Sequence, residues 1–359
     1  MPMRLKLAAT DRRPDLLKNS YRATLDLFEF IHAGILTTVQ DLGRFGYQRY
    51  GVPVSGAMDL FSFEVANTLA GNDKNLASLE MTLAGPTLRV INPCTIAITG
   101  ADMNPTLNGE KVDVWASRSL KTGDVLAFSS AEHGCRAYLA VSGGVQAPEV
   151  LGSRSTYLRG VFGGYRGRPI RKGDVLQGTL SDAKTRIRYV PPEYIPSYPT
   201  NLTIRVVLGP QEDFFTDSGV KTFLNSTYEI SPASDRMGYR LDGPRIEHSK
   251  ETEIVSDGVA VGAIQVPGDR MPIILMRDAQ TTGGYPKIAH VVSSDVNRLA
   301  QLRPGDNIRF EQIDIRRAHE LIYQNMNHLS SLKKEIGERH LVPEFPDGET
   351  LMRFQGAIR

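Results

Sequence analysis

Residues 37–59, TTVQDLGRFGYQRYGVPVSGAMD, set charged and amide side chains among glycines. Glycine packs nothing in a strand interior, and Pro53 together with four glycines interrupts any helical period. Gln40, Asp41 and Arg44 would supply a hydrogen-bonding amide, a candidate base and a cation on a backbone thin enough for close approach. A turn-rich connection between strands is the alternative interpretation.

A second cluster, GSRSTYLRGVFGGYRGR at 152–168, places Arg154, Ser155 and Arg168 on a similarly irregular backbone. Paired arginines beside free backbone N–H groups can clamp an anion or a carboxylate. A barrel corner would explain the glycines equally well, but it has no need of the arginines.

Gln265, Thr282 and Lys287 lie in VGAIQVPGDRMP (261–272) and DAQTTGGYPKIAH (278–290). Hydroxyl and amide groups at a glycine loop can hold a planar hydrogen-bonding substrate such as a urea, an amide or a lactam. Asp278 begins the second of these segments and could act as a base. Capping of the loop by hydrogen bonds to backbone N–H groups is at least as plausible for its carboxylate.

Composition excludes several classes of function. The 42 basic and 40 acidic residues give a net charge of +2, which argues against a nucleic-acid binder, and no apolar run is long enough to span a membrane. The chain has no P-loop, no zinc-binding histidine motif and no segment for covalent biotin, so biotin would require a separate carrier and no metal site is expected. Cys94 and Cys135 lie in apolar runs, which predicts buried free thiols rather than nucleophiles and a cytoplasmic protein.

Short runs rich in β-branched and aliphatic residues predict a mainly β chain, because clusters of Gly, Pro, Asn and Asp separate them. The runs are 87–91, 94–100, 124–129, 136–144, 202–209 and 271–279. Two stretches have helical periodicity: 58–71, which ends at Gly71, and 315–338. The apolar face of the second stretch comprises Ala318, Leu321, Ile322, Met326, Leu329, Leu332 and Ile336.

Four short phrases recur in the same order in the two halves of the chain, which predicts a duplicated barrel. They are P-x-S-x-x-M (53–59 and 232–238), L-x-G-P (83–90 and 241–248), a G-D turn (123–128 and 305–310) and a glycine pair (140–144 and 280–284). A third G-D phrase at 173–176 predicts a tight turn feeding a strand, with structural aspartates. The unrepeated part, Gln40 to Gly51, is where we expect the chemistry.

The predicted division is an extension (1–27), a first domain (28–190), a second domain (191–314) and a C-terminal helix and tail (315–359), with a proline-rich linker at 189–201.

Five motifs in order make the chain similar to the biotin-dependent carboxyltransferase / allophanate hydrolase subunit 2 family. They are the opening stretch, AN.LAGN....ASLE.TLAGP, YLAVSGG, LGSRSTYLRG..GG..GR, and AIQVPGD followed by DAQTTGGYPKIA and LAQLRPGD. The resemblance covers roughly residues 28–314. It implies a mainly β chain of two tandem cyclophilin-like β-barrel domains with a few short helices.

The resemblance also implies partners and an activity. Family members work beside a KipI-like (PxpB-like) subunit, and stand-alone bacterial members join a PxpA-like subunit to open 5-oxoproline to glutamate at the expense of ATP. We expect this role, that of a PxpC-type component of a 5-oxoprolinase, because the chain carries no biotin carboxylase, carrier or fused subunit 1, with ATP bound here or by a partner. The alternatives are a carboxyltransferase subunit that moves a carboxyl group from carboxybiotin to urea or a related amide, and a non-catalytic KipA-type antagonist of a KipI-like kinase inhibitor.

Both enzymatic alternatives need a base and donors for a developing oxyanion at an amide. We expect three walls around one pocket for a small amide substrate. Asp41, Arg44 and Asp278 are the candidate catalytic residues. The candidate substrate-binding residues are Gln40, Ser55, Asp59, Arg154, Ser155, Arg168, Gln265, Thr282 and Lys287.

Overall fold

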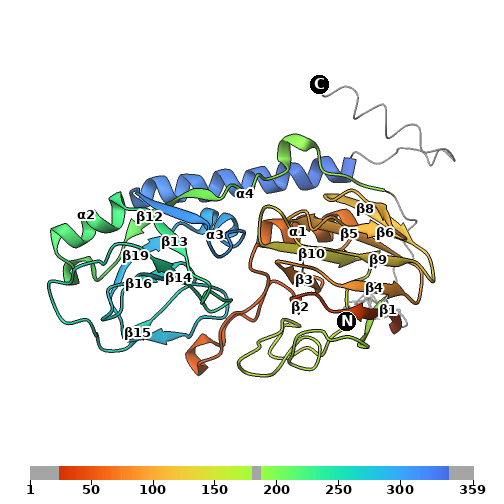
Figure 1. Cartoon of the computed structure of the whole chain (residues 1–359), viewed down its shortest axis with the longest axis horizontal. Helices are drawn as coiled ribbons and strands as arrows, with labels where there is room; N and C mark the ends of the chain where they lie inside the picture. Colours follow the sequence, from red (N-terminus) through yellow and green to blue (C-terminus); the bar gives the residue numbers. More distant parts are fainter. Residues whose placement is uncertain (1–23, 74, 180–186, 339–359) are drawn as a thin grey trace, which may run out of the picture.

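The structure, a computed structural model, describes residues 24–73, 75–179 and 187–338. Two β-rich halves lie next to each other, and one long helix, α4 (Ile315–Glu338), runs along both of them (Figure 1). Residues 1–23 of the predicted extension and 339–359 of the predicted tail lie outside the described residues. None of the helices in the described ranges is long and apolar enough to cross a membrane.

The first half consists of two sheets that share a core. The six-stranded sheet has the order β11-β1-β4-β9-β6-β7, and the five-stranded sheet has the order β2-β3-β10-β5-β8. Buried side chains from both sheets, such as Phe28 and Leu88 from one and Leu79 and Leu139 from the other, form a single cluster. The six strands are β1 (Thr24–His32), β4 (Thr87–Val90), β6 (Thr106–Leu107), β7 (Glu110–Lys111), β9 (Val125–Ala127) and β11 (Val175–Thr179). The five are β2 (Leu36–Gln40), β3 (Ser78–Thr82), β5 (Cys94–Gly100), β8 (Ala116–Leu120) and β10 (Arg136–Val141).

The second half is a closed barrel of order β12-β19-β16-β17-β14-β13-β20. It closes where β12 pairs in parallel with β20, from Asn201 opposite Asn307 to Val206 opposite Gln312, whereas the other pairings are antiparallel. The barrel strands are β12 (Asn201–Leu208), β13 (Tyr228–Ile230), β14 (Gly238–Asp242), β16 (Ala263–Gln265), β17 (Ile273–Leu275), β19 (Lys287–Val291) and β20 (Asn307–Gln312). A small separate ladder joins β15 (Asp257–Gly258) to β18 (Thr282–Gly283).

Both helices expected from periodicity are present. α1 (Leu60–Ala70) begins after Asp59, whose carboxylate accepts a hydrogen bond from Ser62 N, and it ends at Gly71 in the left-handed conformation, as predicted. α4 contacts α1 of the first half and α3 (Ser293–Leu299) of the second, so it links the two halves. Met326 was expected on the apolar face of α4, but its side chain is 58% exposed. Short helices that periodicity did not reveal are α2 (Asp217–Asn225), α3, and the 3-10 turns η1 (Gln48–Tyr50), η2 (Pro192–Tyr194) and η3 (Glu212–Phe214).

The three G-D phrases form the same turn three times. In each, the glycine has a positive φ (Gly123, Gly173 and Gly305), and the aspartate carboxylate accepts a hydrogen bond from the backbone N–H three residues earlier. Each turn feeds a strand, namely β9, β11 and β20. The prediction that these aspartates are structural is confirmed, and so is the predicted fold class. The first half differs from the second in distributing its strands over two sheets. The domain boundaries stay predictions.

Candidate functional site

The loop after β2 doubles back on itself. Arg44 N donates to Val54 O at 2.8 Å, and Ala57 N donates to Asp41 O at 2.8 Å. The two arms are so close that a Cβ atom on Gly43 would lie 2.7 Å from Val54 O, and one on Gly56 would lie 2.8 Å from Gly43 N. Both glycines also have positive φ, so the loop requires glycine at these points.

Asp41 holds this loop to the 152–156 segment. Its buried carboxylate accepts hydrogen bonds from Gly43 N, Ser153 Oγ, Arg154 N and Ser155 Oγ. The backbone N–H of Asp41 in turn donates to Ser155 Oγ at 3.0 Å. Both oxygens of Asp41 are therefore occupied by hydrogen bonds from the protein. We call this set of bonds among Asp41, Gly43 and residues 153–155 the Asp41 knot.

Arg44 is fully buried, yet most of its guanidinium has no protein partner. Nη2 donates to Ser155 O, whereas Nε and Nη1 make no hydrogen bond. Phe162 lies against the cation, 4.9 Å from the guanidinium carbon to the ring centroid. Burial lowers the pKa of Arg44, and the nearby charges of Asp41 and Asp278 only oppose that shift.

Two further buried polar atoms, one at the end of β2 and one on the loop that carries Arg44, also lack partners. Gln40 donates to Thr38 Oγ1 and to Thr156 O, but its Oε1 accepts nothing. Ser55 follows the residue whose carbonyl binds Arg44 N, has a φ of +55°, and leaves its Oγ unpaired. A buried polar group without a partner is costly, and four such atoms within residues 40–55 call for an explanation.

The segment 157–168 covers Arg44. Tyr157 and Phe162 pair through both backbone hydrogen bonds and stack edge to face with ring centroids 5.5 Å apart. A Cβ atom on Gly163 would lie 2.0 Å from Ser155 O and 2.9 Å from Arg44 Nη2. The glycines of this cluster therefore permit close packing of the segment over the arginine.

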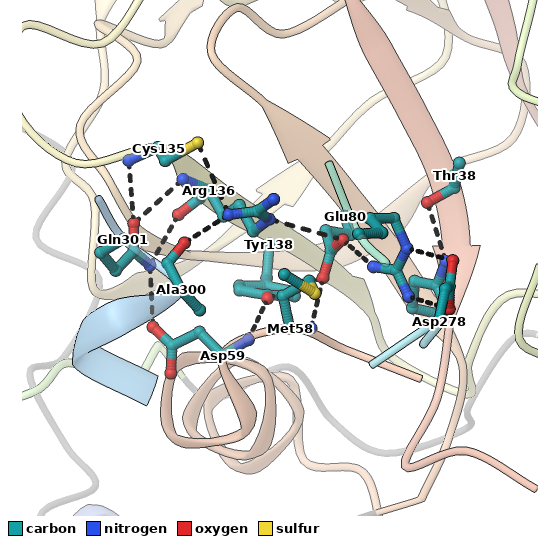
Figure 2. A network of polar contacts seen from close by, with 12 residues as sticks. Thr38, Met58, Asp59, Glu80, Cys135, Arg136, Tyr138, Asp278, Ala300 and Gln301 are labelled. Atoms are coloured by element: carbon teal, nitrogen blue, oxygen red, sulfur yellow. Dashed lines mark hydrogen bonds and ion pairs between the residues drawn. The ribbon is translucent and has the colours of Figure 1, made fainter. Parts of the chain in front are cut away.

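Asp278 is part of a buried charge network between the two halves. Arg236 donates to both of its carboxylate oxygens, at 2.9 and 3.1 Å, and also to Glu80 Oε1 and to Gly56 O. Glu80 Oε2 accepts from Met58 N and from Tyr138 Oη, both at 2.8 Å. Figure 2 follows this network from Asp278 through Glu80 to the Asp59 side of the interface.

The same network continues through Gln301 to Asp59. Gln301 donates to Asp59 Oδ2 at 2.8 Å and accepts from the backbone N–H groups of Cys135 and Arg136. Arg136 donates to Tyr239 Oη and Ala300 O of the second half. Burial raises the pKa of Asp59, while hydrogen bonds from Gln301 and Ser62 work in the opposite direction. Asp59 thus caps α1 and joins the two halves.

The two arginines expected to form a clamp do not meet. Arg168 makes a bidentate ion pair with Asp174, with both N–O distances 2.7 Å. The side chain of Arg154 donates to Ala147 O and lies 3.5 Å from Glu149 at the surface. Of this predicted wall, only Ser155 and the backbone of Arg154 reach the Asp41 knot.

The third predicted wall is a separate cluster in the second half. Lys287 is buried and donates to Asp257 Oδ2 at 2.7 Å, in the β15–β18 ladder that also carries Thr282. Gln265 donates to Tyr285 O at 3.2 Å. No hydrogen bond or ion pair among the described residues joins Gln265, Thr282 or Lys287 to Arg44 or Asp41.

Sequence reasoning missed the residues of the interface network: Glu80, Arg136, Tyr138, Arg236 and Gln301. A signal existed for some of them, because Glu80 interrupts the apolar strand SLEMT and Arg136 begins the apolar run RAYLAV. Charged residues are almost never fully buried unless they are paired. The two predicted free thiols are confirmed as buried, and burial raises the pKa of Cys94 to about 12.

Comparison with known proteins shows which family the chain belongs to. The family model "Carboxyltransferase domain, subdomain A and B" matches residues 50–312. The chain belongs to this carboxyltransferase family. The match begins after Arg44, covers most of both halves and includes the interface residues Glu80, Arg136 and Arg236, which agrees with the resemblance predicted from the motifs.

Similar members of the carboxyltransferase family include the C subunit of 5-oxoprolinase from Escherichia coli (strain K12), which is 37% identical over 292 residues that cover 81% of this chain and 93% of that protein. The protein of the same name from Haemophilus influenzae is 35% identical, and the match covers 84% of this chain and 96% of that protein. Among solved structures, the Kluyveromyces lactis urea carboxylase superimposes with a TM-score of 0.82 at 30% identity, covering 91% of this chain and 31% of that one.

Proposed function

We propose that this chain is the C subunit of an ATP-dependent 5-oxoprolinase, which opens 5-oxoproline to glutamate. The observation that carries the proposal is the similarity to two proteins of that name over 93% and 96% of their lengths. The carboxyltransferase of urea carboxylase is the second candidate, favoured by the structural similarity to the Kluyveromyces lactis enzyme.

The polar cluster around Arg44 is the proposed substrate site. Opening a lactam requires hydrogen-bond donors for the charge that develops on the carbonyl oxygen. Arg44 and Ser55 offer unpaired donors there, and Gln40 offers an unpaired acceptor. Asp278 is the carboxylate that remains a candidate base, with Arg236 fixing its orientation, whereas Asp41 positions the loop.

The enzyme requires other chains, and we propose a PxpB-like subunit and a PxpA-like subunit. The loop after β2 and the 150–168 segment lie on the side of the molecule opposite α4 (Figure 1). Phe45, Tyr50 and Val161 on these two segments are 63%, 65% and 69% exposed. A PxpB-like subunit that covers these apolar side chains would lie on the two segments that enclose Arg44. Replacing Phe45 and Tyr50 with serine should weaken co-elution of the two subunits.

Reconstitution tests the activity. The three purified subunits are mixed with ATP and 5-oxoproline, and glutamate and ADP are measured. We expect glutamate only when this chain is present. Glutamate production without it would favour the regulatory role, and carboxylation of urea from a carboxybiotin carrier would favour the carboxyltransferase.

ATP is a co-substrate in this proposal, and we place the enzyme in the cytoplasm, where ATP is available. Binding of a fluorescent ATP analogue to each subunit alone and to the complex identifies the chain that holds the nucleotide. Biotin takes part only in the carboxyltransferase alternative, in which a separate carrier delivers it.

A further inference from the structure

We propose that Arg44 binds the carboxylate of the substrate, so that the site selects a small monoanionic cyclic amide over a neutral one. The inference rests on the proposed function and extends it to the group that each side chain recognises. Arg44 is then a residue of substrate specificity.

The first argument is the uncompensated charge. Arg44 is fully buried, and neither its Nε nor its Nη1 has a hydrogen-bond partner. Its neighbours Asp41 and Asp278 act on it only through space, since their oxygens are held by the Asp41 knot and by Arg236. A cation buried without a paired anion is strongly unfavourable, and an anionic ligand would remove that cost.

The second argument is the match between the unpaired atoms and one molecule. A carboxylate-bearing lactam presents an anion that accepts hydrogen bonds, a ring N–H that donates, and a ring carbonyl that accepts. The unpaired atoms are two cationic donors on Arg44, the acceptor Gln40 Oε1 and the hydroxyl of Ser55. Urea would leave the cation without a counter-charge. A phosphate dianion fits poorly because the carboxylates of Asp41 and Asp278 lie close by.

Backbone carbonyl groups link the segments that carry Gln40, Arg44 and Ser55. Gln40 Nε2 binds Thr156 O and Arg44 Nη2 binds the preceding carbonyl, Ser155 O. Arg44 N binds Val54 O, one residue before Ser55. The covering segment, with Phe162 over the guanidinium, must shift for a ligand to reach Arg44. Once it closes, Phe162 would shield the ion pair from water.

The test uses the reconstituted complex and two lactams that differ only in the carboxylate, 5-oxoproline and 2-pyrrolidone. Binding of each is measured by calorimetry and turnover by product formation, for wild type, Arg44→Gln and Arg44→Lys. We expect Arg44→Gln to weaken 5-oxoproline binding about 10- to 100-fold, the range for a hydrogen bond to a charged group, and to change 2-pyrrolidone binding less than about threefold. Arg44→Lys should recover part of the preference, since it retains the charge.

The matched control is Arg316→Gln, because Arg316 lies on α4, on the side of the molecule opposite the loop after β2 (Figure 1), and its side chain is 89% exposed. It should leave both affinities unchanged. Equal loss of both lactams in Arg44→Gln, unchanged 5-oxoproline binding, or a raised KM for ATP alone would each overturn the inference. A wild-type complex that binds 5-oxoproline but forms no glutamate would overturn the proposed function and leave the inference standing.

Discussion

Arg44 and Arg236 are both buried arginines that feel the charge of Asp278, and they differ in what surrounds them. All three nitrogens of Arg236 are used, by Asp278, Glu80 and Gly56 O. Arg44 uses one nitrogen, on a single backbone carbonyl. Nearby negative charges raise the pKa of Arg236 despite its burial, whereas burial dominates at Arg44 and lowers its pKa.

This difference suggests a structural role for Arg236 and a ligand-binding role for Arg44. Every nitrogen of the Arg236 guanidinium has a hydrogen-bond partner within the protein, and these bonds join the two halves. The Arg44 guanidinium keeps two nitrogens without a partner in the protein, which supports the proposal that it awaits a ligand. Satisfaction of hydrogen bonds, rather than charge or burial, distinguishes the two.

The largest expected loss of stability follows substitution of Arg236. Arg236→Met should lower the free energy of unfolding by about 3–5 kcal/mol, because it leaves Glu80 and Asp278 buried without their cation. Urea titration of the purified chain measures the change. Arg168→Met removes a bidentate partner of Asp174 nearer the surface and should cost clearly less. Equal losses in the two variants would contradict a special role for the interface network.

The next effect concerns the segment over Arg44. Gly163→Ala should lower the free energy of unfolding by about 2–4 kcal/mol, since the new Cβ would meet Ser155 O and Arg44 Nη2 at a φ of +71°. Gly51→Ala is the control, because Gly51 also has a positive φ, +78°, but nothing lies within 4 Å of its Cβ position. The control should lose only about 1–2 kcal/mol. If the two variants lose the same amount, the close packing over Arg44 contributes nothing.

A smaller effect should appear as a pH dependence at Asp59. Burial raises its pKa in the folded protein above the ordinary value of 3.8, so its contribution to stability is greatest below that value and declines as the pH rises towards the folded pKa. The stability of wild type minus that of Asp59→Asn should therefore fall as the pH rises from about 3.8, the ordinary value. Urea titrations at several pH values measure the slope.

Asp174→Asn provides the opposite slope as a control. Burial works to raise the pKa of Asp174, but hydrogen bonds from Arg168 and Arg171 N hold it below its ordinary value. The stability difference should here rise with pH, because this carboxylate contributes in its ionised form. If the stability difference between wild type and variant changes with pH in the same direction for both variants, the pKa of Asp59 is not raised in the folded protein.

Sequence reasoning located the loop that carries the proposed site but not the contacts of each residue in it. The density of glycine and polar side chains identified Gln40, Asp41 and Arg44, and the repeated phrases predicted the duplication. Which carboxylate is occupied depends on partners more than a hundred positions away, such as Ser153 and Ser155 for Asp41. Neither composition nor spacing reports those contacts.

The repeated phrase P-x-S-x-x-M also shows that a sequence pattern does not report the contacts of each residue. Its recurrence indicated architecture, and Arg236 of the second copy does bind Gly56 O of the first across the interface. Ser55 of the first copy nevertheless leaves its hydroxyl unpaired on the loop that carries Arg44. Position within a repeat therefore does not decide whether a residue is structural, since only the three-dimensional contacts reveal which polar atoms remain unpaired.

The smallest expected change in stability is at Arg44 itself. Arg44→Met removes a buried charge that has one hydrogen bond and replaces it with an apolar side chain against Phe162, so the free energy of unfolding should change by less than about 1 kcal/mol or rise. Glutamate formation by the reconstituted enzyme should nevertheless collapse, because the donors are gone. A loss of stability as large as that of Arg236→Met would mean that Arg44 is satisfied within the protein and that the contrast between the two arginines does not hold.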